Sequence, residues 1–516
     1  MLLKFTLQSF CSVLLAAQLG AAVSLPVGDS TGALSTEATG PAKEALQAFK
    51  EGRHAKAIDL AMPLAEKGNA DALYILGYAS ETGQGMDASR EKALEYYRKA
   101  AATGHKDSTY RLSFILLASE DVTERTQARE ALEKAAKDDP AVAGRILGEA
   151  YLRGVLSKEP DFDKTVFWWS RASDVGDVPS VLLLARLYEG QLGFPDKKDP
   201  KKSLDFYSKA AGLGNSSAMV ALGSRLLNGE EKSRNEKMGR EWLKKAIENK
   251  ETSAYLALGD FEENIKKDPK AALTAYERGR DAGQVDCMLR TAEAYIEGKG
   301  TEKDPTRGFD VLESAAKAGS PMAHYRLATK RLSGEKPDLL LGYGHLLVAA
   351  TGGVVDAQHD LAMFYISGKL AAQDAAAGVA WLTRASQGGN AQSQFALARL
   401  YLEGSGVKQN VASAGQLFSL AANQGHAGAT FAIAQLHGKG IGTDANPTKA
   451  WALATLASER GEAGAKAYAD EIDAKLDDPQ RAAAKKELED IKSGKPAAKP
   501  ATEDKAAPKK PATGPK

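Results

Sequence analysis

The sequence predicts an all-α fold, an α/α superhelical solenoid of about twelve antiparallel helix pairs with disordered termini. Two observations support it: glycines recur every 34 or 36 residues, and apolar residues between them follow helical spacing. Regular periods of this length are typical of stacked supersecondary units. The glycines that define the period are Gly283, Gly319, Gly353, Gly389, Gly425 and Gly461.

The stretch 391–425 shows the repeating unit most clearly. Apolar residues predict a first helix over about 391–403 and a second over about 411–423. Gly404 separates the helices and Gly425 ends the second, because glycine readily adopts the left-handed backbone of a helix C-terminus. Neither helix can bury its apolar stripe alone. The pairs are therefore expected to stack around one continuous core that counts as a single domain.

Bulky and small residues recur at fixed positions of the second helix. Five units have an aromatic residue eight positions before the closing residue, and six units have two small residues four positions after that place. A bulky residue one turn before small ones is typical of interdigitating helix layers, so these aromatics are expected between the layers. They are Tyr96, Trp168, Phe206, Trp242 and Trp381.

One unit near the N-terminus carries a characteristic set of residues: Ala72, Leu76, Gly77, Gly83, Gly85, Lys92-Ala93, Tyr96, Lys99-Ala100-Ala101 and the closing Gly104. The set recurs as Tyr295, Gly298, Gly300, Asp304 and Ala315-Ala316 to Gly319. This pattern resembles the Sel-one-like repeat (SLR) family, a longer relative of the tetratricopeptide repeat, over residues 70–462. The resemblance implies an α/α solenoid that acts as a protein-binding scaffold.

The N-terminal region has three predicted parts. Residues 1–24 begin with Lys4, continue as an apolar stretch and end in small residues, which is typical of a secretory signal peptide. Residues 25–40 are polar and small and predict a flexible linker. Residues 41–69 predict an N-terminal tetratricopeptide-like helix pair. The signal peptide predicts export, to the periplasm or out of the cell.

The solenoid of Sel-one-like repeats is predicted over residues 70–461. Two units are irregular: 105–139 lacks the glycine loop, and 251–283 has a shortened loop from Asn264 to Asp268. Residues 462–492 keep a helical pattern but gain charge, as expected of C-terminal capping helices that end the core in water. Residues 493–516 form a Lys/Pro/Ala-rich tail that is expected to be disordered.

Charge is distributed unevenly along the chain. The tail holds six lysines against Glu503 and Asp504, and the whole chain has a formal charge of +1, so residues 25–492 are mildly acidic. An acidic array disfavours nucleic acid as a partner. The basic tail is a candidate contact for an anionic envelope polymer, and its composition is equally typical of a simple solubilising tail. No segment is long and apolar enough to predict a membrane span.

No residue set in the sequence predicts a catalytic, cofactor-binding or metal site. The seven histidines do not share the helix-turn spacing of a metal site: His54, His105, His324, His345, His359, His426 and His437. His105 and His426 fall at the same position after a closing glycine, which predicts a helix-capping or solvent-facing role. The Gly-x-Gly pairs at 83/85, 298/300, 404/406 and 438/440 predict loops rather than phosphate cradles. Cys287 occupies a small-residue position and is expected to be a packed thiol.

Three functions follow in order of preference. The first is a non-catalytic, exported scaffold or adaptor that binds a protein or peptide partner on the solenoid surface. The second is an adaptor for cell-envelope polysaccharide or peptidoglycan assembly. The third is a β-lactam-binding hydrolase, because Ser89 and Lys92 match a Ser-x-x-Lys pattern. The companion Ser-Asp-Asn and Lys-Thr-Gly motifs are absent from the sequence, which disfavours the third. The identity of the partner, the binding face and the oligomeric state do not follow from the sequence.

Overall fold

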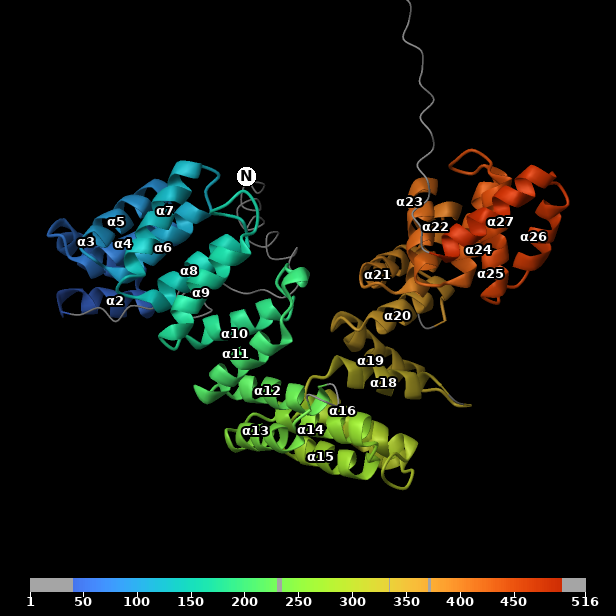
Figure 1. Ribbon diagram of the computed structural model, residues 1–516, viewed down its shortest axis with the longest axis horizontal. Coiled ribbons are helices and arrows are strands. Elements are labelled where there is room, and N and C mark those ends of the chain that lie inside the picture. Colours follow the sequence, from blue (N-terminus) through green and yellow to red (C-terminus); the bar gives the residue numbers. More distant parts are fainter. Residues whose placement is uncertain (1–39, 230–233, 334, 370–372, 494–516) are drawn as a thin grey trace, which may run out of the picture. The chain divides into compact units, whose positions relative to one another are not determined.

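The computed structural model describes residues 40–229, 234–333, 335–369 and 373–493, and these form 26 α-helices without a strand. Consecutive helices pack as antiparallel pairs, which confirms the α/α solenoid (Figure 1). The chain divides into two compact units, Met1–Gly279 and Arg280–Lys516, where the sequence predicted a single core. The division falls near the end of α15 (Pro269–Asp281), in an irregular pair whose first helix has only nine residues.

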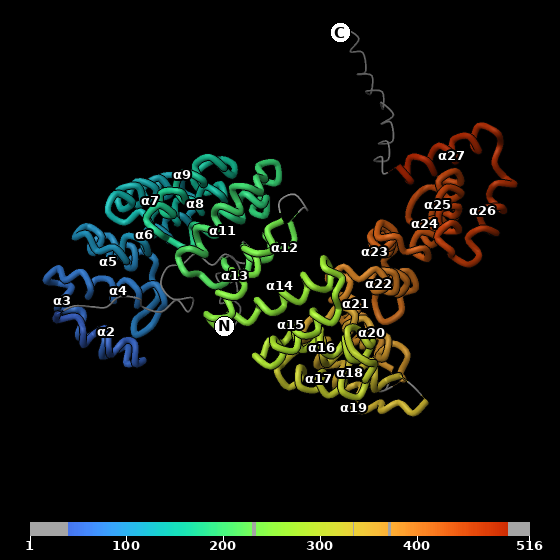
Figure 2. The backbone as a smooth tube through the Cα atoms, turned by 60° about the horizontal axis from the view of Figure 1, so that its bottom comes forward, coloured from blue at the N-terminus to red at the C-terminus, as the bar shows by residue number. Residues whose placement is uncertain are grey.

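The first unit stacks seven helix pairs, drawn in blue to green in Figure 2. Its helices are α2 (Lys43–Lys50), α3 (His54–Glu66), α4 (Ala70–Thr82), α5 (Arg90–Ala102), α6 (Lys106–Leu117), α7 (Val122–Ala135), α8 (Pro140–Leu152), α9 (Phe162–Asp174), α10 (Val178–Tyr188), α11 (Pro200–Gly212), α12 (Ser216–Asn228), α13 (Glu236–Glu248), α14 (Ser253–Phe261) and α15 (Pro269–Asp281). Short 3₁₀ turns lie at Gly40–Ala42 and Pro195–Lys197. The last two residues of α15 belong to the second unit.

The second unit stacks six pairs, and most of its helices have 13 residues. They are α16 (Val285–Glu297), α17 (Pro305–Lys317), α18 (Pro321–Leu332), α19 (Leu339–Thr351), α20 (Val355–Ser367), α21 (Ala375–Gln387), α22 (Ala391–Glu403), α23 (Val411–Asn423), α24 (Ala427–Lys439), α25 (Pro447–Glu459), α26 (Ala465–Asp473) and α27 (Asp478–Lys492). The two helices expected over 391–403 and 411–423 have the expected bounds.

Side-chain caps and glycines define where most helices begin and end. Asn390 accepts a hydrogen bond from the Ser393 backbone N–H, and Asn410 does the same for Ser413, so both helices of this pair start at a capped residue. Gly404 follows α22 with φ of 73° and Gly425 follows α23 with φ of 90°. These left-handed conformations end each helix as expected, because a side chain at either position would strain the backbone.

The residue that fills each layer lies one position later than the sequence predicts. Tyr97, Trp169, Tyr207, Leu243 and Leu382 are buried, and the aromatics just before them are only half-buried. One residue along a helix is a rotation of about 100°, so only one of two neighbouring positions can face the core. The aromatics predicted between the layers therefore border the core instead of filling it.

Two loop predictions also need correction. Gly438 lies inside α24, and the glycines that leave this helix are Gly440 and Gly442, both with positive φ. The shortened loop expected from Asn264 begins later, because α14 continues as a π-helical turn over Glu262–Lys266. The left-handed Lys267 then ends that turn with φ of 55°. The predicted signal peptide, residues 25–39 of the linker and residues 494–516 of the C-terminal tail lie outside the described residues.

Candidate functional site

The second unit contains a long stretch with few charges. Residues 339–438 hold eight charged side chains in one hundred residues: Asp356, Asp360, Lys369, Asp374, Arg384, Arg399, Glu403 and Lys408. In the whole chain 26% of residues are charged. Large apolar side chains also reach the surface here, and Leu340 is 85% exposed. Exposed apolar surface of this kind is typical of regions that contact other molecules.

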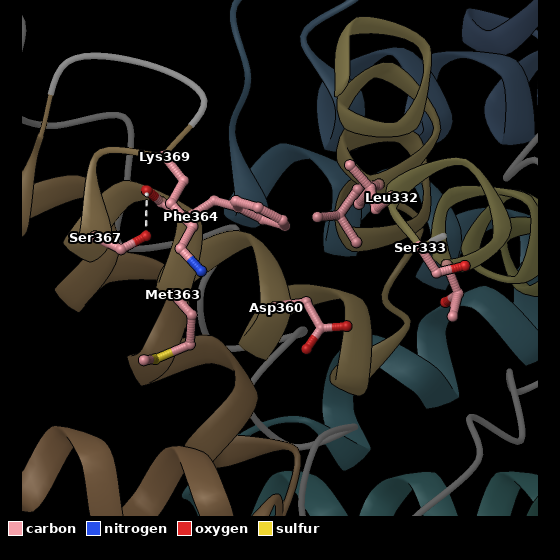
Figure 3. A pocket seen from close by; sticks show the side chains of 9 residues that line it. Leu332, Ser333, Asp360, Met363, Phe364, Ser367 and Lys369 are labelled. Atoms are coloured by element: carbon pink, nitrogen blue, oxygen red, sulfur yellow. Dashed lines mark hydrogen bonds between the residues drawn. The ribbon is translucent and has the colours of Figure 1, made fainter. Parts of the chain in front are cut away.

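A groove opens at the start of this region, between the first helices of two neighbouring pairs, α18 and α20 (Figure 3). Its volume is about 420 Å³. Leu346, from α19, lines it and is buried. The lining residues are Thr329, Leu332, Ser333, Leu346, Asp360, Met363, Phe364, Ser367 and Lys369. Concave sites of a few hundred Å³ with mainly apolar walls are the usual form of binding sites.

The apolar walls come from the ends of the two first helices. Leu332 is the last residue of α18, and the Phe364 ring on α20 points toward it in Figure 3. Met363, one residue before Phe364, is 41% exposed. A methionine side chain adapts easily to different shapes because it is unbranched and polarizable. The groove therefore offers apolar surface that a bound segment could cover.

Asp360 supplies an acidic group to this apolar groove. Its Oδ2 accepts a hydrogen bond of 3.0 Å from the Tyr325 hydroxyl on α18. Burial raises the pKa of Asp360 above its ordinary value of 3.8, and the Tyr325 hydrogen bond only partly opposes that shift. A half-buried carboxylate with one hydrogen bond is costly unless a cation or a further donor approaches it. A basic or hydrogen-bond-donating group of a bound molecule would therefore stabilise the ionised carboxylate of Asp360.

Hydrogen bonds fix the helices around the groove. The Tyr343 and Tyr365 hydroxyls, on α19 and α20, lie 2.7 Å apart. His359 Nδ1 lies 2.8 Å from the Ser393 hydroxyl on α22, which joins two successive pairs. Burial lowers the pKa of His359 and favours its neutral form. The groove is therefore built on helices whose positions are set by side chains next to it.

The structure resolves the roles of several residues that the sequence singles out. His105 and His426 each accept a backbone N–H through Nδ1 at 3.1 Å, which confirms the capping role expected from their shared position. Cys287 is buried, as expected of a packed thiol. His324 and His345 were not expected to meet, yet their Nδ1 atoms lie 2.8 Å apart. They are 21 residues apart on different helices, a separation that helix-turn spacing does not reveal.

Ser89 has a structural role at the start of α5. Its hydroxyl accepts the Lys92 backbone N–H at 3.3 Å, as the N-cap of the helix. The same position before a second helix is an N-cap aspartate or asparagine elsewhere, for example Asp161 and Asn410. The Ser-x-x-Lys match therefore coincides with a helix start, and Lys92 is exposed. A capping role accounts for this pair of residues.

Two absences hold for the described residues only. Within them, histidine, cysteine and acidic side chains do not gather in groups of three or more that could hold a metal ion. None of the helices placed by the structure has the length and apolar character needed to cross a membrane.

Family comparison identifies the repeats. The Sel1 repeat model matches eight segments, 70–105, 145–177, 179–215, 216–250, 285–320, 355–390, 391–426 and 427–462. The segments between them, 106–144, 251–284 and 321–354, fall outside the matches. The first two contain the repeats that are irregular in sequence. The third contains α18 and α19, which border the groove.

Two curated relatives are fungal proteins. Chitin synthase regulatory factor 3 of Schizosaccharomyces pombe is 26% identical over 277 residues, which are 52% of this chain and 30% of that protein. Chitin synthase regulator SKT5 of Saccharomyces cerevisiae is 27% identical over 233 residues, 42% of this chain and 33% of that protein. The chain therefore spans about a third of the length of these relatives.

Two solved structures are similar to the chain. One is c5321, a protective antigen of uropathogenic Escherichia coli with an SLR fold, at 23% identity and a TM-score of 0.48, covering 84% of this chain and 94% of that chain. The other is a Sel1 repeat protein from Oxalobacter formigenes, at 22% identity and a TM-score of 0.43, covering 75% of this chain and 99% of that chain.

Proposed function

The chain belongs to the Sel1 repeat family, and from this premise we propose that it is a non-catalytic, exported scaffold that binds a segment of a partner protein in the groove between α18 and α20. Repeats of this kind suit protein binding, because stacked helices present a long, rigid surface. The observation that carries the proposal is the position of Asp360, a half-buried carboxylate beside apolar side chains.

The groove favours a segment with aliphatic side chains and one basic residue. Leu332, Met363 and Phe364 would cover aliphatic groups, and apolar burial contributes roughly 25 cal/mol per Å² of area removed from water. A lysine or arginine of the partner would pair with Asp360 and lower the cost of keeping that carboxylate ionised. Lys369, at the groove, would repel a second basic residue nearby. The recognised segment therefore combines apolar character with a single cation.

Peptide binding tests this proposal. We would measure fluorescence anisotropy with the full-length protein and a labelled aliphatic peptide that has one central lysine, beside the same peptide with norleucine in its place. Asp360→Asn should weaken binding of the lysine peptide by about tenfold, the equivalent of about 1.4 kcal/mol, and leave binding of the norleucine peptide unchanged. Met363→Glu should weaken binding of both peptides.

Arg399→Ala is the matched control, because Arg399 is an exposed residue of α22 that does not line the groove. It should bind both peptides like the unaltered protein. Equal binding of the two peptides by the unaltered protein, or no effect of either groove substitution, would refute the proposed groove.

The names of the fungal relatives favour a second candidate function. Both are chitin synthase regulators, so an adaptor that acts on an enzyme of polysaccharide assembly is a reasonable alternative for this chain. In that case the lysine-rich residues 493–516 would contact an anionic polymer of the envelope. Deleting them should abolish recovery of glycan in a cross-linking pull-down, and salt should weaken that recovery. If the deletion leaves recovery of one defined protein unchanged, the solenoid is the binding surface.

Export is part of the proposal and rests on the sequence of residues 1–24. Cell fractionation followed by N-terminal sequencing would test it. Export predicts a mature protein outside the cytoplasm that begins near residues 23–25. An uncleaved cytoplasmic protein would show that the scaffold works inside the cell.

A further inference from the structure

His324 and His345 form a side-chain pair that the proposed function does not use. His324 is on α18 and His345 is on α19, the two helices of one pair. Their Nδ1 atoms lie 2.8 Å apart, and their ring centroids are 5.0 Å apart at an angle of 43°. Both side chains are partly exposed, so solvent and small ions can reach them.

The separation of the two nitrogens matches a simple coordination geometry. Imidazole nitrogens bind divalent transition metals at about 2.0 Å, so two of them in adjacent positions at about 90° lie about 2.8 Å apart. Square-planar and tetragonal sites with nitrogen and oxygen donors are typical of Cu²⁺ and Ni²⁺. Tetrahedral Zn²⁺ would place the nitrogens farther apart, at about 3.3 Å. The pair therefore suits Cu²⁺ or Ni²⁺ better than Zn²⁺.

The surrounding residues hold the two rings close together. Ala323 and Leu346, each next in sequence to one of the histidines, are buried and fix the backbone of the two helices. Arg331 and Glu313 are the other charged side chains near His345, and they form an ion pair of 3.6 Å with each other.

We propose that His324 and His345 together bind a Cu²⁺ or Ni²⁺ ion through their Nδ1 atoms, with water molecules as the remaining ligands. The site lies in residues 321–354, a segment outside the family matches, so it is a feature of this repeat rather than of the repeated pattern. Only two protein ligands are involved, which agrees with the absence of larger ligand groups among the described residues. The proposal is independent of peptide binding in the groove.

The alternative for the same geometry is a single hydrogen bond, in which one neutral ring donates its Nδ1–H to the other ring. Such a pair would bind metal no better than any other exposed histidine. Titration calorimetry with Cu²⁺ and with Ni²⁺, on the full-length protein at neutral pH, distinguishes the two. The metal site predicts one equivalent bound, and His324→Ala or His345→Ala should each weaken binding at least about tenfold.

His437→Ala is the matched control, because His437 is a partly exposed histidine of α24 in the same unit. It should keep the affinity of the unaltered protein. Equal affinity in all four proteins would overturn the proposal and leave the hydrogen bond as the only role of the pair. Should an alanine variant fail to fold, electron paramagnetic resonance of Cu²⁺ bound to the unaltered protein decides. Coupling to two imidazole nitrogens supports the site, and coupling to one or none overturns it.

Discussion

The two compact units differ in most of the residues that fill their layers. In the first unit a glycine of the first helix faces a large side chain of the second, as Gly77 faces Tyr97 and Gly148 faces Trp169. A Cβ on Gly77 would lie 2.6 Å from the Tyr97 ring, so no side chain fits there. In the second unit the corresponding residues are alanines and smaller apolar side chains. These pairs are Ala292 with Leu312, Ala328 with Leu346, Ala362 with Leu382 and Ala398 with Phe418.

The tyrosines of the first unit also make directional bonds. Tyr97 donates to Glu81 at 2.7 Å, and Arg111 of the next pair donates to the same carboxylate at 3.3 Å. Tyr207 donates to Glu189 at 3.1 Å, and Tyr276 donates to Glu263 at 2.8 Å. Burial raises the pKa of Tyr207 to about 12, so its hydroxyl keeps its proton. The second unit has leucine or phenylalanine at the equivalent positions of α17, α19, α21 and α23, and alanine in α25.

This difference shows that one repeat pattern can be stabilised in two ways. At the layer-filling position the first unit uses tyrosines that make directional hydrogen bonds, whereas the second unit uses apolar contacts there and places its tyrosine hydrogen bonds beside the groove. The candidate groove and the three consecutive exposed leucines, Leu339, Leu340 and Leu341, both lie in the second unit. The candidate binding surface therefore lies in the unit whose layer-filling residues are apolar.

The largest expected effect comes from overpacking the first unit. In Gly148→Ala the new methyl group would overlap the buried Trp169 ring, and we expect the free energy of unfolding to fall by about 3 kcal/mol. Gly415→Ala is the matched control in a helix of the second unit, where a Cβ meets nothing within 4 Å. It should be neutral or stabilising by up to about 1 kcal/mol. Hydrogen exchange in each unit measures the change in the free energy of unfolding for both variants. Equal losses of stability in the two variants would remove the contrast between the units.

A smaller effect is expected from removing one tyrosine hydroxyl. Tyr97→Phe deletes the hydrogen bond to Glu81 and should cost about 1–2 kcal/mol in the first unit. Tyr401→Phe is the control in the second unit, because its partly exposed side chain packs against apolar neighbours. It should change stability by less than about 0.5 kcal/mol. If Tyr401→Phe lowered the free energy of unfolding as much as Tyr97→Phe, tyrosine hydroxyls would stabilise both units alike.

The raised pKa of Asp360 gives the second unit a pH dependence. As the pH rises above 3.8, the unfolded carboxyl ionises before the folded one, so the free energy of unfolding falls until the raised pKa is passed. Asp360→Asn should remove this fall and stabilise the unit at neutral pH, although it weakens binding of the basic peptide. Denaturant unfolding between about pH 3 and pH 8 measures the slope. Asp374→Asn, an exposed helix cap, should keep the original slope.

The smallest effect on stability is expected at the exposed leucines. Leu340→Gln should change the free energy of unfolding by less than about 0.5 kcal/mol, because the side chain is 85% exposed. It should nevertheless reduce self-association in light scattering, since Leu339 and Leu341 extend the apolar surface. Val122→Gln, at an exposed position of the first unit, should leave both measurements unchanged. A stability loss at Leu340 alone would mean that these leucines are packed.

The helix pairs could be predicted because their signals are local. Apolar spacing and glycine positions lie within single helices, so the bounds of α22 and α23 follow from the sequence. The groove could not be predicted, because it depends on how α18 and α20 approach each other. His324 and His345 meet for the same reason, across two helices. Two signals were present but unused: the scarcity of charge over residues 339–438, and glycines such as Gly148 spaced to face a large residue.

The caps at the start of the helices have a consequence for how such a chain can change in length. α22 and α23 each have a capping side chain at the start and a glycine with positive φ after the end. The ends of these helices are therefore determined by residues of the pair itself, and little by the sequence outside it. A gene segment that begins and ends at closing glycines therefore encodes a complete module. Duplication of such a segment would insert two complete helices. Its deletion would remove two complete helices, and every remaining helix would keep its N-cap and its C-terminal glycine. Recombination in units of about 36 residues is thus tolerated by the same features that stop each helix.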